Sequence, residues 1–479
     1  MASTSRRLEP TAPADGDLLA VSDVLQCPTC AAGAVAPDDS GATLVCQYCA
    51  APFPVTRSDV ASIPWLFPDP VAARLQWKAR YNGFLHRNSQ DLERLRLARS
   101  RAPNGTRARR RINQLLQARE RYRNQVTGLM EPFGLEHIDW PADSTDLLRS
   151  RLPWTQGLSG YVSNVFRDWC WDNGETDAMF GLVEDLLPSD DVGSILTLGA
   201  GACRLPYDLH RRFRPDSSTV LDLNPMLLEI AARTMCAEDV SLYEFPLAPL
   251  GEAAVLQRCS APAALDRGDI RFVLGDAIDM PFVARSFDTV VTPWLIDIIA
   301  HDLRLLVQRI NHCLADGGVW INTGSLAFFH QNELWRYSEE EVRELIGSLG
   351  FEVLSWERRL MPYLQSPHSA QRRFEEVLSF AVRKIAHTGP PDGAMYLPDW
   401  ILDPSLPVPA SADAAISSSN FLLKAQVFAA IDGKQTIKQI GRSLARQYGL
   451  GKAETIHAVR QILIDEWEHT QSRQFDADL

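Results

Sequence analysis

The chain has 479 residues, of which 46% are hydrophobic, and a formal net charge of −12 at pH 7. This composition predicts a folded protein of about two to four domains and excludes a chain disordered throughout. The acidic balance argues against a nucleic-acid partner, because nucleic-acid binding depends on neutralising phosphates. No apolar run is long enough to span a membrane, and residues 1–17 lack the apolar centre of a signal peptide, so we expect a cytoplasmic protein with no membrane contact.

We expect a disordered tail at residues 1–20. The first predicted element after it is defined by four cysteines. The spacing C-x2-C-x15-C-x2-C is formed by Cys27, Cys30, Cys46 and Cys49. Two such knuckles can bring four thiolates to one tetrahedral zinc ion, and four sulfur ligands leave no place for water, so the metal would be structural. Disulfides are the alternative, which a cytosolic location disfavours. We therefore predict a zinc ribbon at residues 21–68.

An arginine-rich helical stretch comes next and runs from Lys78 to Arg123. The sequence Ala102-Pro-Asn-Gly105 interrupts it, so residues 69–148 are predicted to contain a helical hairpin with one apolar and one basic face. Contact with RNA or an acidic peptide is the functional alternative, but a run of charge is usually a solvated face.

The central segment, residues 149–388, carries the clearest motif. Residues 195–225 predict a strand from Ile195 to Leu198, a turn containing Gly199 and Gly201, a helix, and a second strand ending near Asp222. Glycines let the backbone approach a ligand closely, and a carboxylate about twenty residues further on can accept hydrogen bonds from ribose hydroxyls. This spacing predicts a site for a nucleoside cofactor.

The residue at the position where dinucleotide-binding proteins have a third glycine indicates the type of nucleoside cofactor. Arg204 stands there, which disfavours NAD and favours S-adenosylmethionine. Asp276 and Ala277 follow another predicted strand and are placed to meet an adenine. Further strands are expected at residues 286–292 and 314–322, which completes an α/β pattern with a doubly wound sheet.

Several of these motifs together resemble the carnosine N-methyltransferase family of class I S-adenosylmethionine-dependent methyltransferases, over about residues 150 to 386. The motifs are Arg167-Asp-Trp169, Leu198-Gly-Ala-Gly-Ala-Cys-Arg-Leu205, Val290-Val-Thr-Pro-Trp-Leu-Ile-Asp297 and Trp320-Ile-Asn-Thr-Gly-Ser-Leu326. The resemblance implies a Rossmann-like domain that binds S-adenosylmethionine and methylates an imidazole nitrogen.

The resemblance also implies roles for cofactor-binding residues. Asn164, in place of a family Gln, and Arg167 would hold the methionine end, with Arg167 forming a bidentate fork on its carboxylate. Gly199 would line the methionine moiety. Asp222, in place of a family Glu, would hold the ribose, and Asp276 would meet the adenine with Ala277, in place of an aromatic residue.

On the acceptor side, the resemblance points to Asp297, His330 and Tyr363. A carboxylate at Asp297 would accept the N–H of an imidazole and so present the other ring nitrogen to the methyl group, and His330 would orient the substrate or remove a proton. Alternatives stay open for the first two: Asp297 as a helix N-terminal residue, and His330 as a core histidine. Tyr363 lies in a proline-broken loop, after which we expect a helix from Gln371 to Lys384.

The cysteine knuckles, with the following Phe53-Pro-Val55 and Ile63-Pro-Trp-Leu-Phe67, resemble the small zinc-ribbon activator subunit of RNA and protein methyltransferases. This resemblance implies a fused module that stabilises the enzyme or docks its substrate.

Beyond a proline-rich linker at residues 389–418, residues 419–479 have the pattern of three helices. They resemble the small peptide-binding helical domain of pyrroloquinoline quinone and modified-peptide biosynthesis, and a winged-helix fold fits equally. We expect a protein or peptide partner there.

Two functions follow: an N-methyltransferase for a histidine-containing metabolite, peptide or protein, or a non-catalytic methyltransferase-like scaffold that binds partners.

Overall fold

The computed structural model describes residues 23–135, 157–328, 333–390, 407 and 422–475. The chain divides into two compact units, of which the first extends to Pro391 and the second begins at Asp392. The expected tail at residues 1–20, most of the expected linker and the candidate His330 lie outside the described residues.

The first unit is built on a seven-stranded sheet. From edge to edge its strands are β12 (Phe351–Pro362), β13 (Phe374–Lys384), β11 (Leu314–Gly324), β10 (Phe287–Pro293), β5 (Ser194–Leu198), β6 (Ser217–Asp222) and β9 (Ile270–Leu274). Strand β13 is antiparallel to both of its neighbours, and the pairs from β11 to β9 are all parallel. The expected doubly wound sheet of the class I methyltransferase type is confirmed.

The central strands are buried along nearly their whole length, as strands covered on both faces should be. Helices α5 (Glu175–Leu186) and α6 (Arg204–Phe213) contribute Val183 and Leu209 to a cluster with Ile195 of β5. The remaining elements of this domain are α4 (Val162–Trp169), α7 (Pro225–Met235), α8 (Leu303–Cys313), η4 (Glu333–Trp335), α9 (Glu339–Ser348) and the antiparallel pair β7 (Val240–Glu244) and β8 (Val255–Cys259).

The expected helix from Gln371 to Lys384 is wrong. Residues 374–384 form β13, which lies between β11 and β12 and is paired with both. Its apolar run, Val377 to Val382, is buried at every position. A short apolar run of this kind does not distinguish a buried strand from a buried helix by periodicity, and the two neighbouring strands decide its conformation.

The ribbon, residues 23–68, joins the domain at the edge of its sheet. It contains the antiparallel strands β1 (Val35–Pro37), β2 (Thr43–Cys46), β3 (Pro52–Arg57) and β4 (Ser62–Pro64). Just after β4, Trp65 forms a parallel bridge with Leu274 of β9, and the N–H of Leu66 donates to the carbonyl of Leu274 at 2.8 Å. The ribbon thus covers an edge strand that would otherwise leave its backbone groups unpaired.

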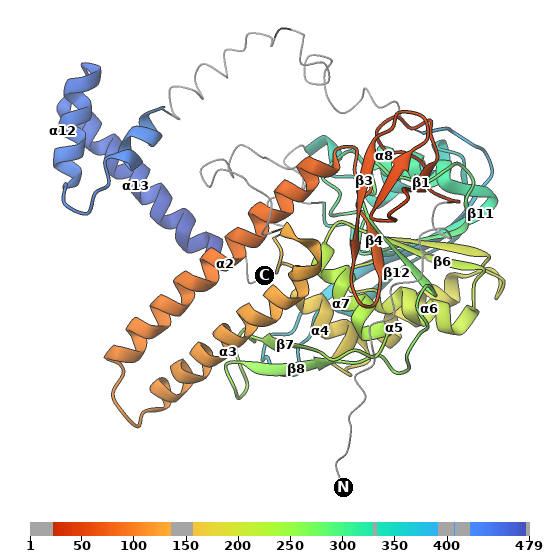
Figure 1. Ribbon diagram of the computed structural model, residues 1–479, viewed down its shortest axis with the longest axis horizontal. Helices are drawn as coiled ribbons and strands as arrows, with labels where there is room; N and C mark the ends of the chain where they lie inside the picture. The colour runs from red at the N-terminus through yellow and green to blue at the C-terminus, as the bar shows by residue number, and fades with distance from the viewer. Residues whose placement is uncertain (1–22, 136–156, 329–332, 391–406, 408–421, 476–479) are drawn as a thin grey trace. The chain divides into compact units, whose positions relative to one another are not determined.

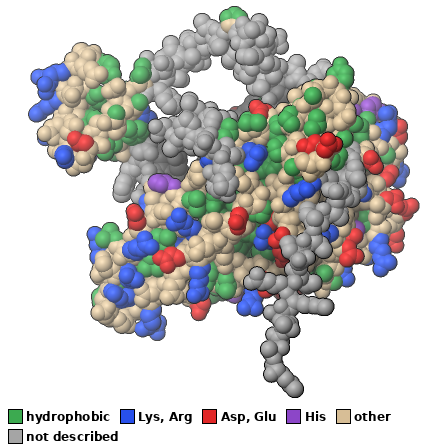
Figure 2. Space-filling model, in the orientation of Figure 1, with side chains coloured by type: hydrophobic (Ala, Val, Ile, Leu, Met, Phe, Trp, Pro, Cys, Tyr) green, Lys and Arg blue, Asp and Glu red, His purple; other side chains and the backbone are tan. Residues whose placement is uncertain are grey.

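Two long helices follow the ribbon and form the hairpin, which comprises α2 (Pro70–Arg101) and α3 (Arg107–Met130), followed by the short η1 (Glu131–Phe133). Asp69 and Thr106 cap their N-termini by accepting from Ala72 and Arg109, and the helices lie side by side (Figure 1). The predicted turn at residues 102–105 separates them. Basic side chains are scattered over their visible surface (Figure 2), as a solvated face would show.

One hydrophobic cluster contains residues of the ribbon, the hairpin and the α/β domain together. Trp65 of the ribbon, Trp77 and Tyr122 of the hairpin, and Val220 and Leu274 of the sheet all belong to it. The three segments therefore share a core and are expected to unfold together.

The second unit contains a helix at residues 422–429, α12 (Ile437–Tyr448) and α13 (Lys452–Phe475). Its core includes Val427, Ile440, Leu444 and Val459. Residues 422–475 contain no strand, so the described part fits the helical expectation. Across the described ranges, no helix has the length and hydropathy needed to cross a membrane.

We expect Trp65→Ala to destabilise the first unit by about 3–5 kcal/mol, because the side chain is 0% exposed and its loss leaves a cavity where ribbon and sheet meet. Chemical denaturation of the parent and the variant measures this change. The control Val71→Ala removes a side chain that is 66% exposed and should change stability by less than about 0.5 kcal/mol. Equal stabilities of the two variants would contradict the shared core.

Candidate cofactor and acceptor site

A cleft opens where the strand order of the sheet reverses. The chain passes outward from β5 to β6 and β9 and then returns to β10 on the other side of β5, and ligands of doubly wound sheets bind at such points. The cleft has about 1220 Å³ of empty space, its open mouth included. All the residues expected at the cofactor line it: Asn164, Arg167, Gly199, Gly201, Asp222, Asp276 and Ala277.

The two glycines after β5 are required by the shape of this turn. Gly199 and Gly201 have φ values of 64° and 58°, in the left-handed region that favours glycine. A Cβ at Gly199 would lie 2.8 Å from Cδ1 of Leu295, so the Leu295 side chain, which lines the cleft, would have to shift. The N–H of Gly201 donates to Oδ2 of Asp222 at 2.8 Å. The turn is therefore bonded to the end of the next strand.

Asp222 ends β6 and its carboxylate faces this turn. Its Oδ1 accepts from the N–H of Asn224 at 2.8 Å, while Oδ2 is bonded to Gly201. Burial raises the pKa of Asp222 to about 6, against the lowering effect of the N–H groups of Asn224, Gly201 and Leu223. A half-buried carboxylate fixed by backbone donors can still accept from ligand hydroxyls.

Arg167 is held rigidly by its neighbour. Its Nε and Nη2 both contact Oδ1 of Asp168, at 2.8 and 2.7 Å, and both side chains are almost fully buried. Burial alone would lower the pKa of Arg167, but the charge of Asp168, followed by Tyr363 and Glu175, raises it above its ordinary value. Its Nη1 is buried without a hydrogen-bond partner among the described residues. A buried cationic donor left over in a cleft fits an anionic group of a ligand.

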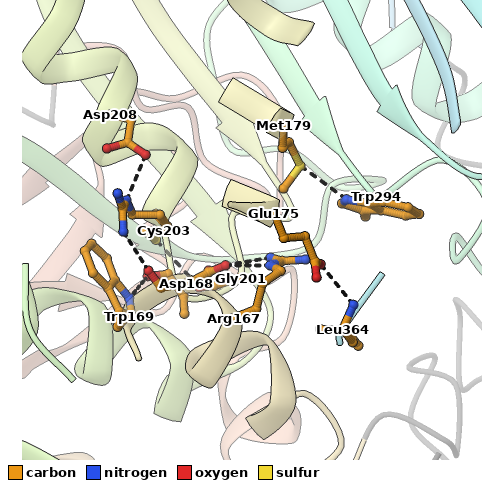
Figure 3. A network of polar contacts seen from close by, with 12 residues as sticks. Arg167, Asp168, Trp169, Glu175, Met179, Gly201, Cys203, Asp208, Trp294 and Leu364 are labelled. Atoms are coloured by element: carbon orange, nitrogen blue, oxygen red, sulfur yellow. Dashed lines mark hydrogen bonds and ion pairs between the residues drawn. The ribbon is translucent and has the colours of Figure 1, made fainter. Parts of the chain in front are cut away.

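Glu175, a residue that the sequence reasoning missed, affects Arg167 through its charge and bonds to the loop after β12. Its carboxylate accepts from the N–H of Leu364 at 2.9 Å and of Gln365 at 3.3 Å. Burial raises the pKa of Glu175, and the Leu364 N–H and Arg167 oppose this shift. Figure 3 shows Arg167 reaching toward Asp168 and Glu175, with Leu364 beyond. The contact spans 189 positions of sequence, so no local signal indicates it.

Arg204 occupies the first turn of α6 and explains the missing third glycine. Its Nε donates to Asp208 at 2.8 Å and its Nη1 donates to the carbonyl of Asp168 at 3.0 Å. The arginine thus fixes the backbone of the residue that holds Arg167, a role that glycine could not perform.

The segment after β9 lies against the ribbon. Asp276 Oδ1 accepts from the N–H of Ile278 at 2.9 Å, which shapes the turn that contains Ala277. A Cβ at Gly275 would lie 3.1 Å from the carbonyl oxygen of Leu66. This wall of the cleft therefore has the ribbon directly behind it.

Two of the three acceptor-side candidates are described, and neither is among the residues that line the cleft, although each adjoins a residue that does. Asp297 is in the turn after β10, whose residues Trp294, Leu295 and Ile298 line the cleft. Burial raises the pKa of Asp297 to about 7, and a hydrogen bond with Ser325 opposes this shift. Helix α8 begins at Leu303 with Asp302 as its N-cap, so the alternative of Asp297 as its capping residue is wrong.

The ring of Tyr363 lies 4.4 Å from that of Trp294, centroid to centroid, at an angle of 50°. Trp294 also donates from Nε1 to Sδ of Met179 at 3.2 Å. Tyr363 therefore supports an aromatic side chain of the cleft wall. Trp294 and Tyr363 are far apart along the chain, so no local sequence pattern indicates that their rings pack together.

The four predicted metal ligands come together in the ribbon. The sulfur atoms of Cys27, Cys30, Cys46 and Cys49 all lie within 4.8 Å of one another. The pairs Cys27 with Cys49 and Cys30 with Cys46 are each 3.7 Å apart. A tetrahedron with zinc–sulfur bonds of 2.3 Å has edges of about 3.8 Å, so the cluster has the size of a zinc site.

Comparison with known proteins gives one family match. Residues 161–386 match the model of the carnosine N-methyltransferase family. No curated protein matches the chain.

Among solved structures, a SAM-dependent methyltransferase from Thermotoga maritima matches at 16% identity over 47% of this chain and 92% of its own, with a TM-score of 0.28. The N-methyltransferase NodS of Bradyrhizobium japonicum matches at 16% identity over 45% and 99%, with a TM-score of 0.31. A complex of the Haloferax volcanii Trm112 methyltransferase activator with a methyltransferase matches at 16% identity over 48% and 95%, with a TM-score of 0.33. Values this low carry no conclusion about substrate or partner.

The raised pKa of Asp222 predicts a pH-dependent affinity for S-adenosylmethionine. If Asp222 accepts from the ribose hydroxyls as the sequence predicts, it would lose the charge that strengthens this acceptance as pH falls through about 6. We therefore expect affinity to fall about tenfold between pH 7.5 and 5. Calorimetric titration across this range measures it. Asp222→Asn should bind weakly at every pH, and an equal pH dependence in that variant would assign the effect to another group.

Proposed function

Because residues 161–386 belong to the carnosine N-methyltransferase family and form an S-adenosylmethionine-dependent methyltransferase, we propose that this enzyme methylates an imidazole nitrogen of a histidine-containing metabolite, peptide or protein. The observation that carries the proposal is a half-buried carboxyl, Asp297, in the turn whose neighbouring residues Leu295 and Ile298 line the cleft. S-adenosylmethionine supplies a methyl group on a positively charged sulfur when it is bound.

On the cofactor side, the unpartnered Nη1 of Arg167 is a donor for the carboxylate of the methionine moiety, which Asn164 would help to hold. Gly199 and Gly201 leave room for the ligand beside bare backbone. Asp222 would accept from the ribose hydroxyls, and Asp276 with Ala277 would border the adenine. Fixing the cofactor along its length positions the methyl group, and positioning supplies much of the rate of such a displacement.

On the acceptor side, Asp297 would accept the N–H of the imidazole. This bond selects the tautomer whose other nitrogen carries a free lone pair, and it stabilises the positive charge that the ring acquires as the methyl group arrives. The role requires the carboxylate form of Asp297. A pKa of about 7 means that this form is lost as pH falls below neutrality.

The remaining acceptor assignments stay predictions. Tyr363, packed on Trp294, would shape the substrate end of the cleft, and His330 would orient the imidazole or remove its proton. If the substrate is a peptide, the second unit would help to bind it, since its helices are expected to bind a protein or peptide partner.

Asp297→Asn should lower kcat by about 10²–10⁴-fold while leaving the affinity for S-adenosylmethionine within about twofold, because the variant removes the charge from the acceptor side alone. In the parent, kcat should fall as pH drops below about 7. Mass spectrometry of histidine, histidine dipeptides and histidine peptides detects the added methyl group.

The matched control is Asp302→Asn, which keeps a good N-cap on α8 and should retain activity. If the parent binds S-adenosylmethionine and methylates none of these acceptors, the imidazole assignment fails. Absence of cofactor binding would favour the non-catalytic scaffold.

We also propose that the ribbon holds one structural zinc ion through its four cysteines, and that this ion supports the cofactor site. The support is the sulfur tetrahedron and the contact of Leu66 with Gly275 beside the adenine wall. Four protein ligands close the coordination shell, so the ion would have no part in the chemistry.

Cys46→Ser should reduce bound zinc well below one equivalent, lower the melting temperature and weaken cofactor binding, because the ribbon and the domain share a core. Elemental analysis, thermal unfolding and calorimetry measure the three effects. Cys236→Ser, outside the cluster, should retain the metal. Full zinc content in the Cys46 variant would overturn the assignment.

A further inference from the structure

The wall of the cofactor cleft includes a tryptophan from the hairpin. Trp77 lies in α2, outside residues 161–386, and its side chain lines the same cleft as Arg167 and Asp222. Only 2% of its surface is exposed, and it belongs to the core shared by the three segments. The guanidinium of Arg80 lies over its ring, 4.9 Å from the centroid. The ring is therefore fixed at the edge of the cleft.

The indole N–H of Trp77 is buried without an acceptor among the described residues. The other buried tryptophans behave differently, because each donates to a protein oxygen: these are Trp65, Trp169, Trp171 and Trp320. Buried N–H groups are almost always satisfied by protein, water or ligand. An unsatisfied indole in the wall of a ligand cleft indicates that its acceptor belongs to the ligand.

We propose that Trp77 donates its indole N–H to the adenosine half of S-adenosylmethionine, which makes the hairpin a part of the cofactor site. The inference rests on the cofactor binding proposed above and adds a residue to it.

The two unpartnered donors of the cleft differ in chemistry, and this difference assigns them to different ends of the ligand. Arg167 is cationic and bidentate in shape, which suits a carboxylate. Trp77 offers one neutral N–H on a broad apolar ring, which suits a ribose oxygen or a ring nitrogen of adenine beside an apolar surface.

The test compares Trp77→Phe with Trp320→Phe in the full chain. Phenylalanine keeps an aromatic ring and removes the N–H, so Trp77→Phe should weaken binding of S-adenosylhomocysteine by about three- to tenfold. Without ligand, removal of an unsatisfied donor offsets part of the packing lost with the smaller ring, so the melting temperature of Trp77→Phe should fall by less than that of Trp320→Phe. Trp320→Phe loses a bond to Thr292 and should show the larger fall in melting temperature and unchanged affinity.

A ligand fragment separates the two ends of the site. Methylthioadenosine lacks the amino-acid group, so Trp77→Phe should weaken its binding by the same factor, whereas Arg167→Lys should weaken only S-adenosylhomocysteine. An indole N–H resonance that is absent from Trp77→Phe should move downfield when S-adenosylhomocysteine is added to the parent.

Equal affinity of the parent and Trp77→Phe for both ligands would overturn the inference and leave the proposed function intact. A lower melting temperature without ligand and unchanged affinity would assign Trp77 a packing role only. Failure of the parent to bind either ligand would instead overturn the proposed function.

Discussion

One hydrophobic cluster, shared by the ribbon, the hairpin and the α/β domain, is the constraint on which the joining of these three segments depends. Trp65 reaches it from the ribbon, Trp77 and Tyr122 from the hairpin, and Leu274 from the edge of the sheet. Burial of apolar surface is the main stabilising contribution in folding. Because the three segments bury that surface against one another, the ribbon and the hairpin depend on the α/β domain, which also has a cluster of its own around Ile195.

Burial within the first unit also affects the electrostatics of the cleft. Burial raises the pKa of Asp222 and of Asp297, and it leaves Nη1 of Arg167 and Nε1 of Trp77 without partners. Groups in such surroundings interact more strongly with a ligand than groups exposed to water. We therefore expect the ligand affinity of the cleft and its pH dependence to follow from the burial of these groups.

Local sequence patterns were sufficient to predict the structure wherever the functional residues lie within one short stretch of the chain. The strand, glycine turn and helix from Ile195 to Phe213 were predicted correctly, because the required backbone conformations leave a direct mark in the sequence. The cysteine spacing likewise predicted correctly that four sulfur atoms lie close together. The segment 374–384 was misread, since a short apolar run is compatible with both a helix and a strand until its neighbours are known.

The sequence by itself determined the class of the enzyme, the glycine turn with Asp222, and the cluster of four cysteines, because each depends on residues at fixed short spacings. Only the tertiary structure decided which distant residues complete the cleft. Glu175 bonds to Leu364, Trp294 packs on Tyr363, and Trp77 reaches the cofactor wall from another segment. Such contacts form when whole elements pack against each other. The contacting residues are far apart along the chain, so no repeating pattern in the sequence indicates them.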